Sequence, residues 1–90
     1  MINNYHIKWT KNAASELKYW QKKDPKVISR IKTLILDIQD EPFTGIGKPE
    51  PLKYSLSGYW SRRITSSHRL VYRIDDKQKT IIIIQCRYHY

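Results

Sequence analysis

The chain has 90 residues, 40% of them hydrophobic, which is enough for one small domain (residues 1–90) with one core. Seventeen Lys and Arg against eight Asp and Glu give a net charge of +9. Such a charge attracts nucleic acid, an acidic protein or an anionic membrane surface, unless it only serves solubility. No apolar run is long enough to span a bilayer, residues 1–4 begin no secretory signal, and the single Cys86 forms no internal disulfide. We therefore expect a cytoplasmic protein that does not span or anchor in a membrane.

The N-terminal third predicts a strand and two helices. Residues 5–9 alternate apolar and polar, as in a strand with one buried face. Thr10 is a suitable N-cap for a helix that ends near Lys23. Asp24-Pro25 combines a capping side chain with a proline suited to the first helical position, so a second helix should run to Asp40-Glu41. The second helix has an apolar stripe formed by Val27, Ile28, Ile31, Leu34, Ile35 and Ile38.

The remainder of the chain predicts strands. Two glycines and two prolines exclude regular structure from residues 43–51, and residues 52–54 are expected to begin a short strand. Further strands are predicted over residues 59–65, 69–74 and 80–88, joined by turns at Ser66-Ser67 and at residues 75–78. The last strand would then hold the terminal residues at its end. The predicted fold is α+β: a small, antiparallel-dominated sheet with two N-terminal helices on one face, in the order β-α-α-β-β-β. The other face would carry the polar side chains and a site.

Glu50 is the first candidate for chemistry. It lies between Pro49 and Pro51, which restrict the backbone on both sides, and it is flanked by Lys48 and Lys53. A carboxylate on such a stiff loop can be aimed at a substrate. The alternative interpretation is an ordinary, solvated loop glutamate.

Arginines on the predicted strands form a second candidate group, consisting of Arg62, Arg63, Arg69 and Arg73. Guanidinium groups can bind a phosphate through two hydrogen bonds and stabilise charge on it. An exposed basic face that only aids solubility is an equally good interpretation. A strict two-residue turn at Ser66-Ser67 would point Arg63 and Arg69 to opposite faces of the sheet. A longer loop or a bulge would bring them to the same face, and the sequence leaves this open.

His89 and Tyr90 end the chain, where a histidine can act as a general acid and either ring can stack on a base. His6 and His68 look incidental. No His/Cys cluster has the spacing of metal ligands, so neither a metal nor another cofactor is expected. A carboxylate, arginines and a histidine together suit metal-free cleavage of RNA, in which the 2′-hydroxyl attacks the adjacent phosphate.

Several motifs closely resemble the YoeB (Txe) toxins, which belong to the RelE superfamily of type II toxin–antitoxin systems. The resemblance rests on GKPEPLK (residues 47–53), on SGYWSRRIT (57–65), on HRLVY (68–72) and on CRYHY (86–90). It implies the RelE-like fold and a translation-dependent mRNA endoribonuclease. Such a toxin enters the ribosomal A site, cuts the message and leaves a 2′,3′-cyclic phosphate and a 5′-hydroxyl. It also implies inhibition by a cognate YefM-type antitoxin, and binding of operator DNA only as the toxin–antitoxin complex.

The resemblance also implies roles for individual residues. Glu50 would be the general base and His89 the general acid. Arg69 would stabilise the scissile phosphate with support from Arg63, and Tyr90 would contact or orient the nucleotide at the cut. Lys53, Lys48 and Arg62 are expected to bind substrate. The alternative function is a ribosome-binding translation inhibitor that does not cut. The codon preference, the antitoxin's identity and whether the chain forms a homodimer are left open.

Overall fold

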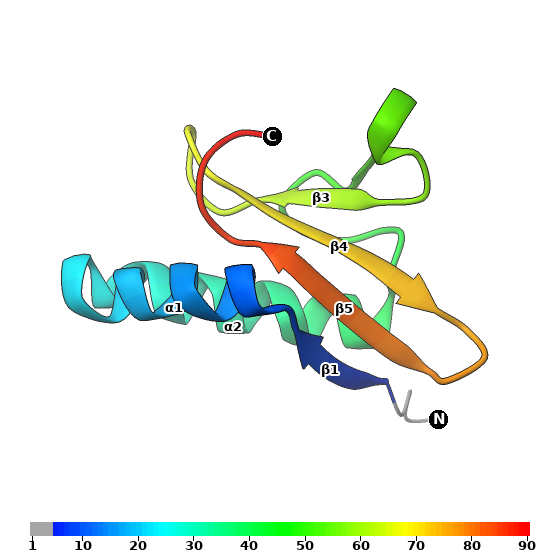
Figure 1. Cartoon of the computed structure of the whole chain (residues 1–90), viewed down its shortest axis with the longest axis horizontal. Coiled ribbons are helices and arrows are strands. Elements are labelled where there is room, and N and C mark those ends of the chain that lie inside the picture. The colour runs from blue at the N-terminus through cyan, green and yellow to red at the C-terminus, as the bar shows by residue number, and fades with distance from the viewer. Residues whose placement is uncertain (1–4) are drawn as a thin grey trace.

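The computed structural model describes residues 5–90 as two helices lying together across one face of a sheet (Figure 1). The first four residues, on which the expected lack of a signal segment rests, lie outside the described part. The elements in chain order are β1 (His6–Trp9), α1 (Lys11–Lys23), α2 (Pro25–Asp40), β2 (Glu50–Pro51), the 3-10 helix η1 (Tyr54–Leu56), β3 (Trp60–Arg63), β4 (Arg69–Asp75) and β5 (Thr80–Gln85). The strand order across the sheet is β1-β5-β4-β3-β2. Strand β1 runs parallel to β5, and the other neighbours are antiparallel.

Both helices form where the sequence predicts them, because their caps are local. The Thr10 side chain accepts a hydrogen bond from the Ala13 N–H at 3.2 Å, and the Asp24 carboxylate accepts one from the Lys26 N–H at 3.2 Å. Proline occupies the start of α2, where a missing N–H costs nothing. Within the described residues, neither helix is long and apolar enough to cross a membrane.

The core lies between the helices and the sheet. Its buried side chains come from the apolar stripe of α2, from Ala13 and Trp20 of α1, and from alternate positions of β4 and β5. Cys86 is part of this core, and burial, with a smaller contribution from the nearby Glu16, raises the pKa of its thiol to about 12. The thiol is therefore a packing group and not a nucleophile.

The strand-rich half corrects three of the sequence-based expectations. Residues 50–51, expected to be irregular, pair with β3 as the edge strand β2, where a proline is tolerated because no partner needs its N–H. Residues 52–54 begin no strand, since Tyr54 adopts a φ of +58° and starts η1. Strand β5 ends at Gln85, because the Cys86 N–H donates to the Glu16 side chain and no longer to a strand. The terminal residues therefore follow the core strand without continuing it.

Candidate functional site

A buried arginine holds the loop that leads to Glu50. The Arg62 side chain is 0% exposed and forms an ion pair with Asp37 of α2. Its guanidinium also donates to the main-chain carbonyls of Glu41, Thr44 and Ile46 at 2.8–3.0 Å. One side chain thus fixes three carbonyls of the connection between α2 and β2, and so it sets the path by which the chain reaches Glu50.

Gly45 is required in this loop by its surroundings. It has a φ of +126°, which side chains rarely adopt, and a Cβ there would lie 2.0 Å from the Asp37 Oδ2 atom. That oxygen accepts hydrogen bonds from Arg62 and from the Ile46 N–H. Burial acts to raise the pKa of the Asp37 carboxyl, but these hydrogen bonds and the charge of Arg62 outweigh burial and lower it. Asp37 is therefore held as an anion against Arg62.

The sheet then presents Glu50 on the face away from the helices. Glu50 pairs with Ser61 of β3, and the Gly47 carbonyl accepts from the Arg63 N–H at 2.7 Å. Because side chains alternate along a strand, Ser61 and Arg63 share one face while Arg62 points to the core. Glu50 is exposed, and its loop is fixed by these main-chain bonds.

The pairing of β3 with β4 shows that Arg63 and Arg69 lie on the same face of the sheet. Arg63 lies opposite Arg69, so the connection between them spans residues 64–68 and is longer than a two-residue turn. The longer loop brings both side chains to the same face. Arg69 is 8% exposed, and its Nη1 donates to the carbonyls of Thr65, Ser66 and His68 at 2.9–3.3 Å, which orient the guanidinium.

The last five residues curve back from β5 toward β3, as Figure 1 shows, and hydrogen bonds hold them. The Trp20 indole donates to the Cys86 carbonyl at 2.8 Å, and the Tyr88 N–H donates to the His68 Nδ1 at 2.7 Å. The Tyr88 carbonyl accepts from the Arg69 N–H at 2.9 Å. His68 is thus not incidental, because its ring fixes the main chain just before His89.

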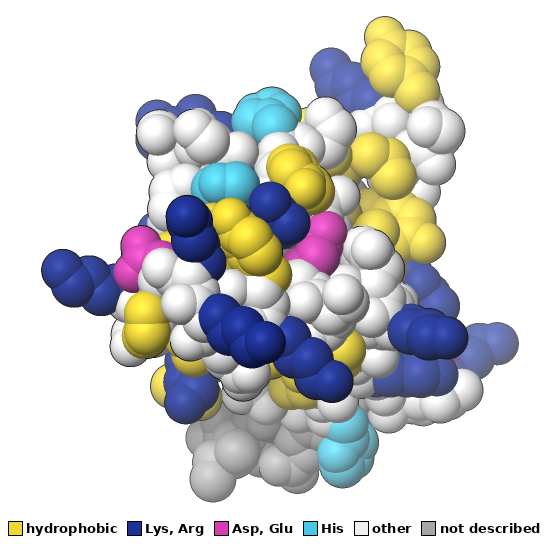
Figure 2. Space-filling view, turned by 60° about the vertical axis from the view of Figure 1, so that its left-hand side comes forward, with side chains coloured by type: hydrophobic (Ala, Val, Ile, Leu, Met, Phe, Trp, Pro, Cys, Tyr) yellow, Lys and Arg dark blue, Asp and Glu magenta, His cyan; other side chains and the backbone are white. Residues whose placement is uncertain are grey.

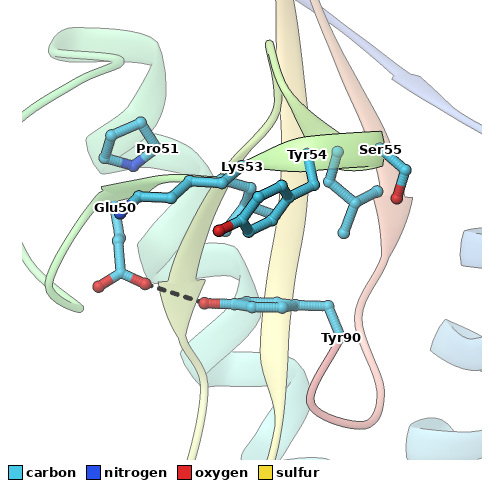
Figure 3. Close-up of a pocket in the computed structure, with 8 residues that line it drawn as sticks. Glu50, Pro51, Lys53, Tyr54, Ser55 and Tyr90 are labelled. Atoms are coloured by element: carbon cyan, nitrogen blue, oxygen red, sulfur yellow. Dashed lines mark hydrogen bonds between the residues drawn. The ribbon is translucent and has the colours of Figure 1, made fainter.

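These elements enclose a small polar pocket of about 140 Å³. It is lined by Lys48, Glu50, Ser61, Arg63, Arg69, His89 and Tyr90. The Tyr90 hydroxyl donates to the Glu50 Oε1 at 2.9 Å, the hydrogen bond drawn in Figure 3, so the terminal residue contacts the edge strand directly. Glu50, His89 and the two arginines therefore line one pocket, which offers a carboxylate, an imidazole and two guanidinium groups to a single ligand.

The structure contradicts one of the three substrate-binding predictions and leaves the other two as predictions. Arg62 was expected to bind substrate, and this is wrong because the side chain is fully buried and its guanidinium is engaged by Asp37 and carbonyls. Lys53 lines an adjoining, larger pocket of about 640 Å³, together with η1, Glu50 and Tyr90 (Figure 3). Lys48 lines the smaller pocket.

Ser61 lines the small pocket and His68 holds the main chain just before His89, although the sequence pattern indicated a functional role for neither. A signal for Ser61 was available, since it precedes Arg63 by two residues and so shares its face of the strand. No local signal marks His68, because its contacts to Tyr88 and to the Trp20 ring, 4.8 Å away, come from distant segments. On the face shown in Figure 2, Lys and Arg side chains are numerous and Asp and Glu side chains are sparse, so this face favours binding of a polyanion.

Comparison with known proteins gives a consistent result over nearly the whole chain. Residues 9–90 match the family model described as the YoeB-like toxin of bacterial type II toxin–antitoxin systems. The toxin YoeB of Streptomyces coelicolor is 52% identical over 84 residues, which is 93% of this chain and 98% of the relative. A YoeB/ParE toxin from Agrobacterium tumefaciens superimposes with a TM-score of 0.91 at 44% identity, covering 94% of this chain and 99% of that one.

Two solved structures from Staphylococcus aureus contain similar chains in assemblies. One is a YoeB dimer, with a TM-score of 0.87 and 44% identity over 96% of this chain and 98% of that one. The other is a heterotetrameric YoeB–YefM toxin–antitoxin complex, with a TM-score of 0.86 and 43% identity over 97% of this chain and 99% of that one. The RelE-like architecture predicted from the sequence is confirmed, with β2 added as an edge strand.

Proposed function

Because the chain belongs to the YoeB-like toxins of bacterial type II toxin–antitoxin systems, we propose that it is a ribosome-dependent mRNA endoribonuclease. In this proposal it cuts mRNA in the ribosomal A site, without a metal, and so inhibits translation. One observation carries the proposal: Glu50, Arg63, Arg69, His89 and Tyr90 line the same small pocket. A carboxylate, two guanidinium groups and an imidazole are sufficient for acid–base cleavage of RNA.

The reaction begins at the ribose 2′-hydroxyl. Glu50 removes the 2′-hydroxyl proton, and the oxygen attacks the adjacent phosphorus, forming the O2′–P bond as the P–O5′ bond breaks. His89 donates a proton to the departing 5′-oxygen. The products are a 2′,3′-cyclic phosphate and a 5′-hydroxyl, so the reaction needs no added reductant, oxidant or water.

The arginines and Tyr90 prepare the site for that reaction. Charge builds up on the nonbridging oxygens of the phosphate in the transition state, and Arg69, with Arg63 beside it, stabilises that charge. The three carbonyls on the Arg69 Nη1 fix its guanidinium before substrate arrives, which avoids reorganisation during the reaction. Tyr90 holds one oxygen of Glu50 and so orients the carboxylate.

The net charge of +9 suits two proposed partners. One is the ribosome, where RNA surrounds the A site and attracts basic side chains. The other is a YefM-type antitoxin, proposed because the S. aureus relative was solved in complex with YefM. Operator DNA would be bound only by the toxin–antitoxin complex. A homodimer is proposed from the dimeric S. aureus relative, and the cytoplasm is the proposed location.

The test is a map of 5′ ends on one mRNA in a reconstituted translation system, with and without ribosomes. The proposal expects new ends inside A-site codons only when ribosomes are present, each carrying a 5′-hydroxyl. Cuts at the same positions and rate in free RNA would contradict ribosome dependence. Translation arrest without new ends would instead identify a non-cutting inhibitor.

His68 gives a further expected result within this function. His68→Leu removes the acceptor of the Tyr88 N–H, which is one of the hydrogen bonds that hold the main chain just before His89 and Tyr90. Misplacing a catalytic group by about 1 Å can cost about 10²-fold in rate, so cleavage should fall by up to that factor. His68→Asn, which keeps an acceptor oxygen near the Nδ1 position, should recover part of the loss.

Amide hydrogen exchange separates this positioning role from general destabilisation. The Tyr88 amide should exchange faster in His68→Leu than in the wild type, while core amides of β4 keep their protection. Faster exchange throughout β4 would mean that His68 acts on overall stability. An unchanged Tyr88 amide would refute the positioning role.

A further inference from the structure

We propose that the larger pocket, between η1 and the C-terminus, binds the base of the nucleotide whose 2′-hydroxyl attacks, with the Tyr54 ring as its stacking surface. The inference rests on the proposed ribonuclease function and names the recognition subsite of that same site. The pocket holds about 640 Å³, within the range of about 300–1,000 Å³ that is usual for small-molecule sites, so a nucleoside fits. Figure 3 shows Tyr54 and Tyr90 with their rings projecting toward the Glu50 end of this pocket.

The exposure of Tyr54 is the first supporting observation. Its side chain is 93% exposed, on a short 3-10 helix that stands away from the sheet at the upper right of Figure 1. Its φ of +58° is uncommon for a bulky residue, whose Cβ crowds the main chain in that region. The ring therefore gains almost no burial from the fold, and the backbone that presents it is strained. Strain of this kind concentrates at sites that bind ligands.

The residues that line each pocket indicate which nucleotide the larger pocket would bind. Glu50 and Tyr90 line both pockets, whereas His89 lines only the smaller one among the residues that the structure describes. In the proposed reaction Glu50 acts on the 2′-hydroxyl, and His89 acts on the 5′-oxygen of the following nucleotide. The larger pocket lies on the Glu50 side, and so it would receive the base on the 5′ side of the cut.

The other groups in the pocket suit a nucleotide. Lys53 supplies a cation for the upstream phosphate, and the Ser55 hydroxyl can donate to or accept from the edge of a base. Stacking between a base and an aromatic ring is strong and tolerates every base, so the subsite would add affinity for any codon. The selectivity would then come from the polar edge beside Ser55.

A double-mutant cycle between protein and RNA tests the contact directly. The substrates are programmed ribosomes carrying either the normal mRNA or one with an abasic nucleotide on the 5′ side of the cut, at single turnover. Tyr54→Leu on normal mRNA and wild type on abasic mRNA should each lose roughly 5- to 100-fold in rate, the range expected of one stacked base. Combining them should cost no more than either alone, because both remove the same contact.

The controls define what would overturn the inference. Tyr54→Phe keeps the ring and should cut nearly as the wild type does, whereas Leu36→Ala removes an exposed apolar side chain of α2 and should change nothing. Multiplicative losses in the cycle, or an unchanged rate for Tyr54→Leu, would overturn the subsite. If Tyr54→Leu cuts normally but resists a YefM-type antitoxin, the ring binds protein and the inference is also wrong. Absence of any cut by the wild type would refute the ribonuclease function itself.

Discussion

Glu50→Gln and His89→Gln are each expected to slow cleavage of A-site mRNA by about 10²- to 10⁴-fold, the usual contribution of a general base or acid. Glutamine keeps the size of either side chain, and at position 50 it keeps an oxygen for the Tyr90 hydroxyl, so the pocket should survive. What is lost is the ability to take a proton from the 2′-hydroxyl or to give one to the 5′-oxygen. The measurement is the single-turnover rate on programmed ribosomes.

Matched controls come from the same residue types elsewhere on the surface. Glu41→Gln and His6→Gln change exposed side chains outside both pockets and should leave the rate unchanged. The double variant should lose less than the product of the two single losses, because the two groups act in one step. Wild-type rates in either single variant would remove that residue from the mechanism. Undiminished arrest of translation by both variants would favour inhibition by binding alone.

The helices could be predicted because their signals are local. Thr10 and Asp24 cap the first turns, Pro25 fits the start of α2, and the apolar stripe repeats at helical spacing. Strand ends were less predictable. Strand β5 ends at Gln85 because the next main-chain N–H, that of Cys86, donates to the side chain of Glu16. Glu16 is far away in the sequence, so no local pattern near Gln85 could predict this contact.

The sequence alone could not assign the two adjacent arginines of β3 to the two faces of the sheet. Arg62 and Arg63 are neighbours on a strand, so one must face the core and the other must not, but their identical chemistry does not say which. Asp37 and three loop carbonyls decide it, and they belong to segments whose approach depends on the whole fold. The motif that resembles the YoeB family contains both arginines. It does not show which of them lines the pocket and which of them holds the loop.

Arg62→Met is therefore expected to lower the free energy of unfolding by about 3 kcal/mol, the low end of the usual cost of removing one partner from a buried ion pair, because Asp37 is 29% exposed and water would still solvate its charge. It would leave Asp37 without its cation, and it would leave the carbonyls of Glu41, Thr44 and Ile46 without their donor. The total free energy of unfolding of a small domain is only about 5–15 kcal/mol, so this loss would be a large fraction of it. Urea denaturation followed by tryptophan fluorescence measures it.

Arg63→Met is the matched control, since it removes the same charge one residue further along β3 on the exposed face. Its free energy of unfolding should stay within about 0.5 kcal/mol of the wild-type value, as is usual for surface substitutions. The rate at which it cleaves mRNA should fall. Should Arg62→Met fail to fold, Arg62→Lys provides the comparison, because it keeps the charge but loses the planar fork of donors and should be destabilised less. Equal stability of the Arg62 and Arg63 variants would refute the anchoring role.

Acid provides an independent check on the same ion pair. The pKa of Asp37 is lowered in the folded state, so its contribution to stability is present above the pKa of the unfolded chain and is lost as the pH falls through the folded value. Arg62→Met abolishes the main cause of that lowered pKa. The stability difference between wild type and Arg62→Met should therefore be largest near neutral pH and should shrink as Asp37 becomes protonated. A difference that is independent of pH would mean that Arg62 stabilises the loop through its carbonyl contacts alone.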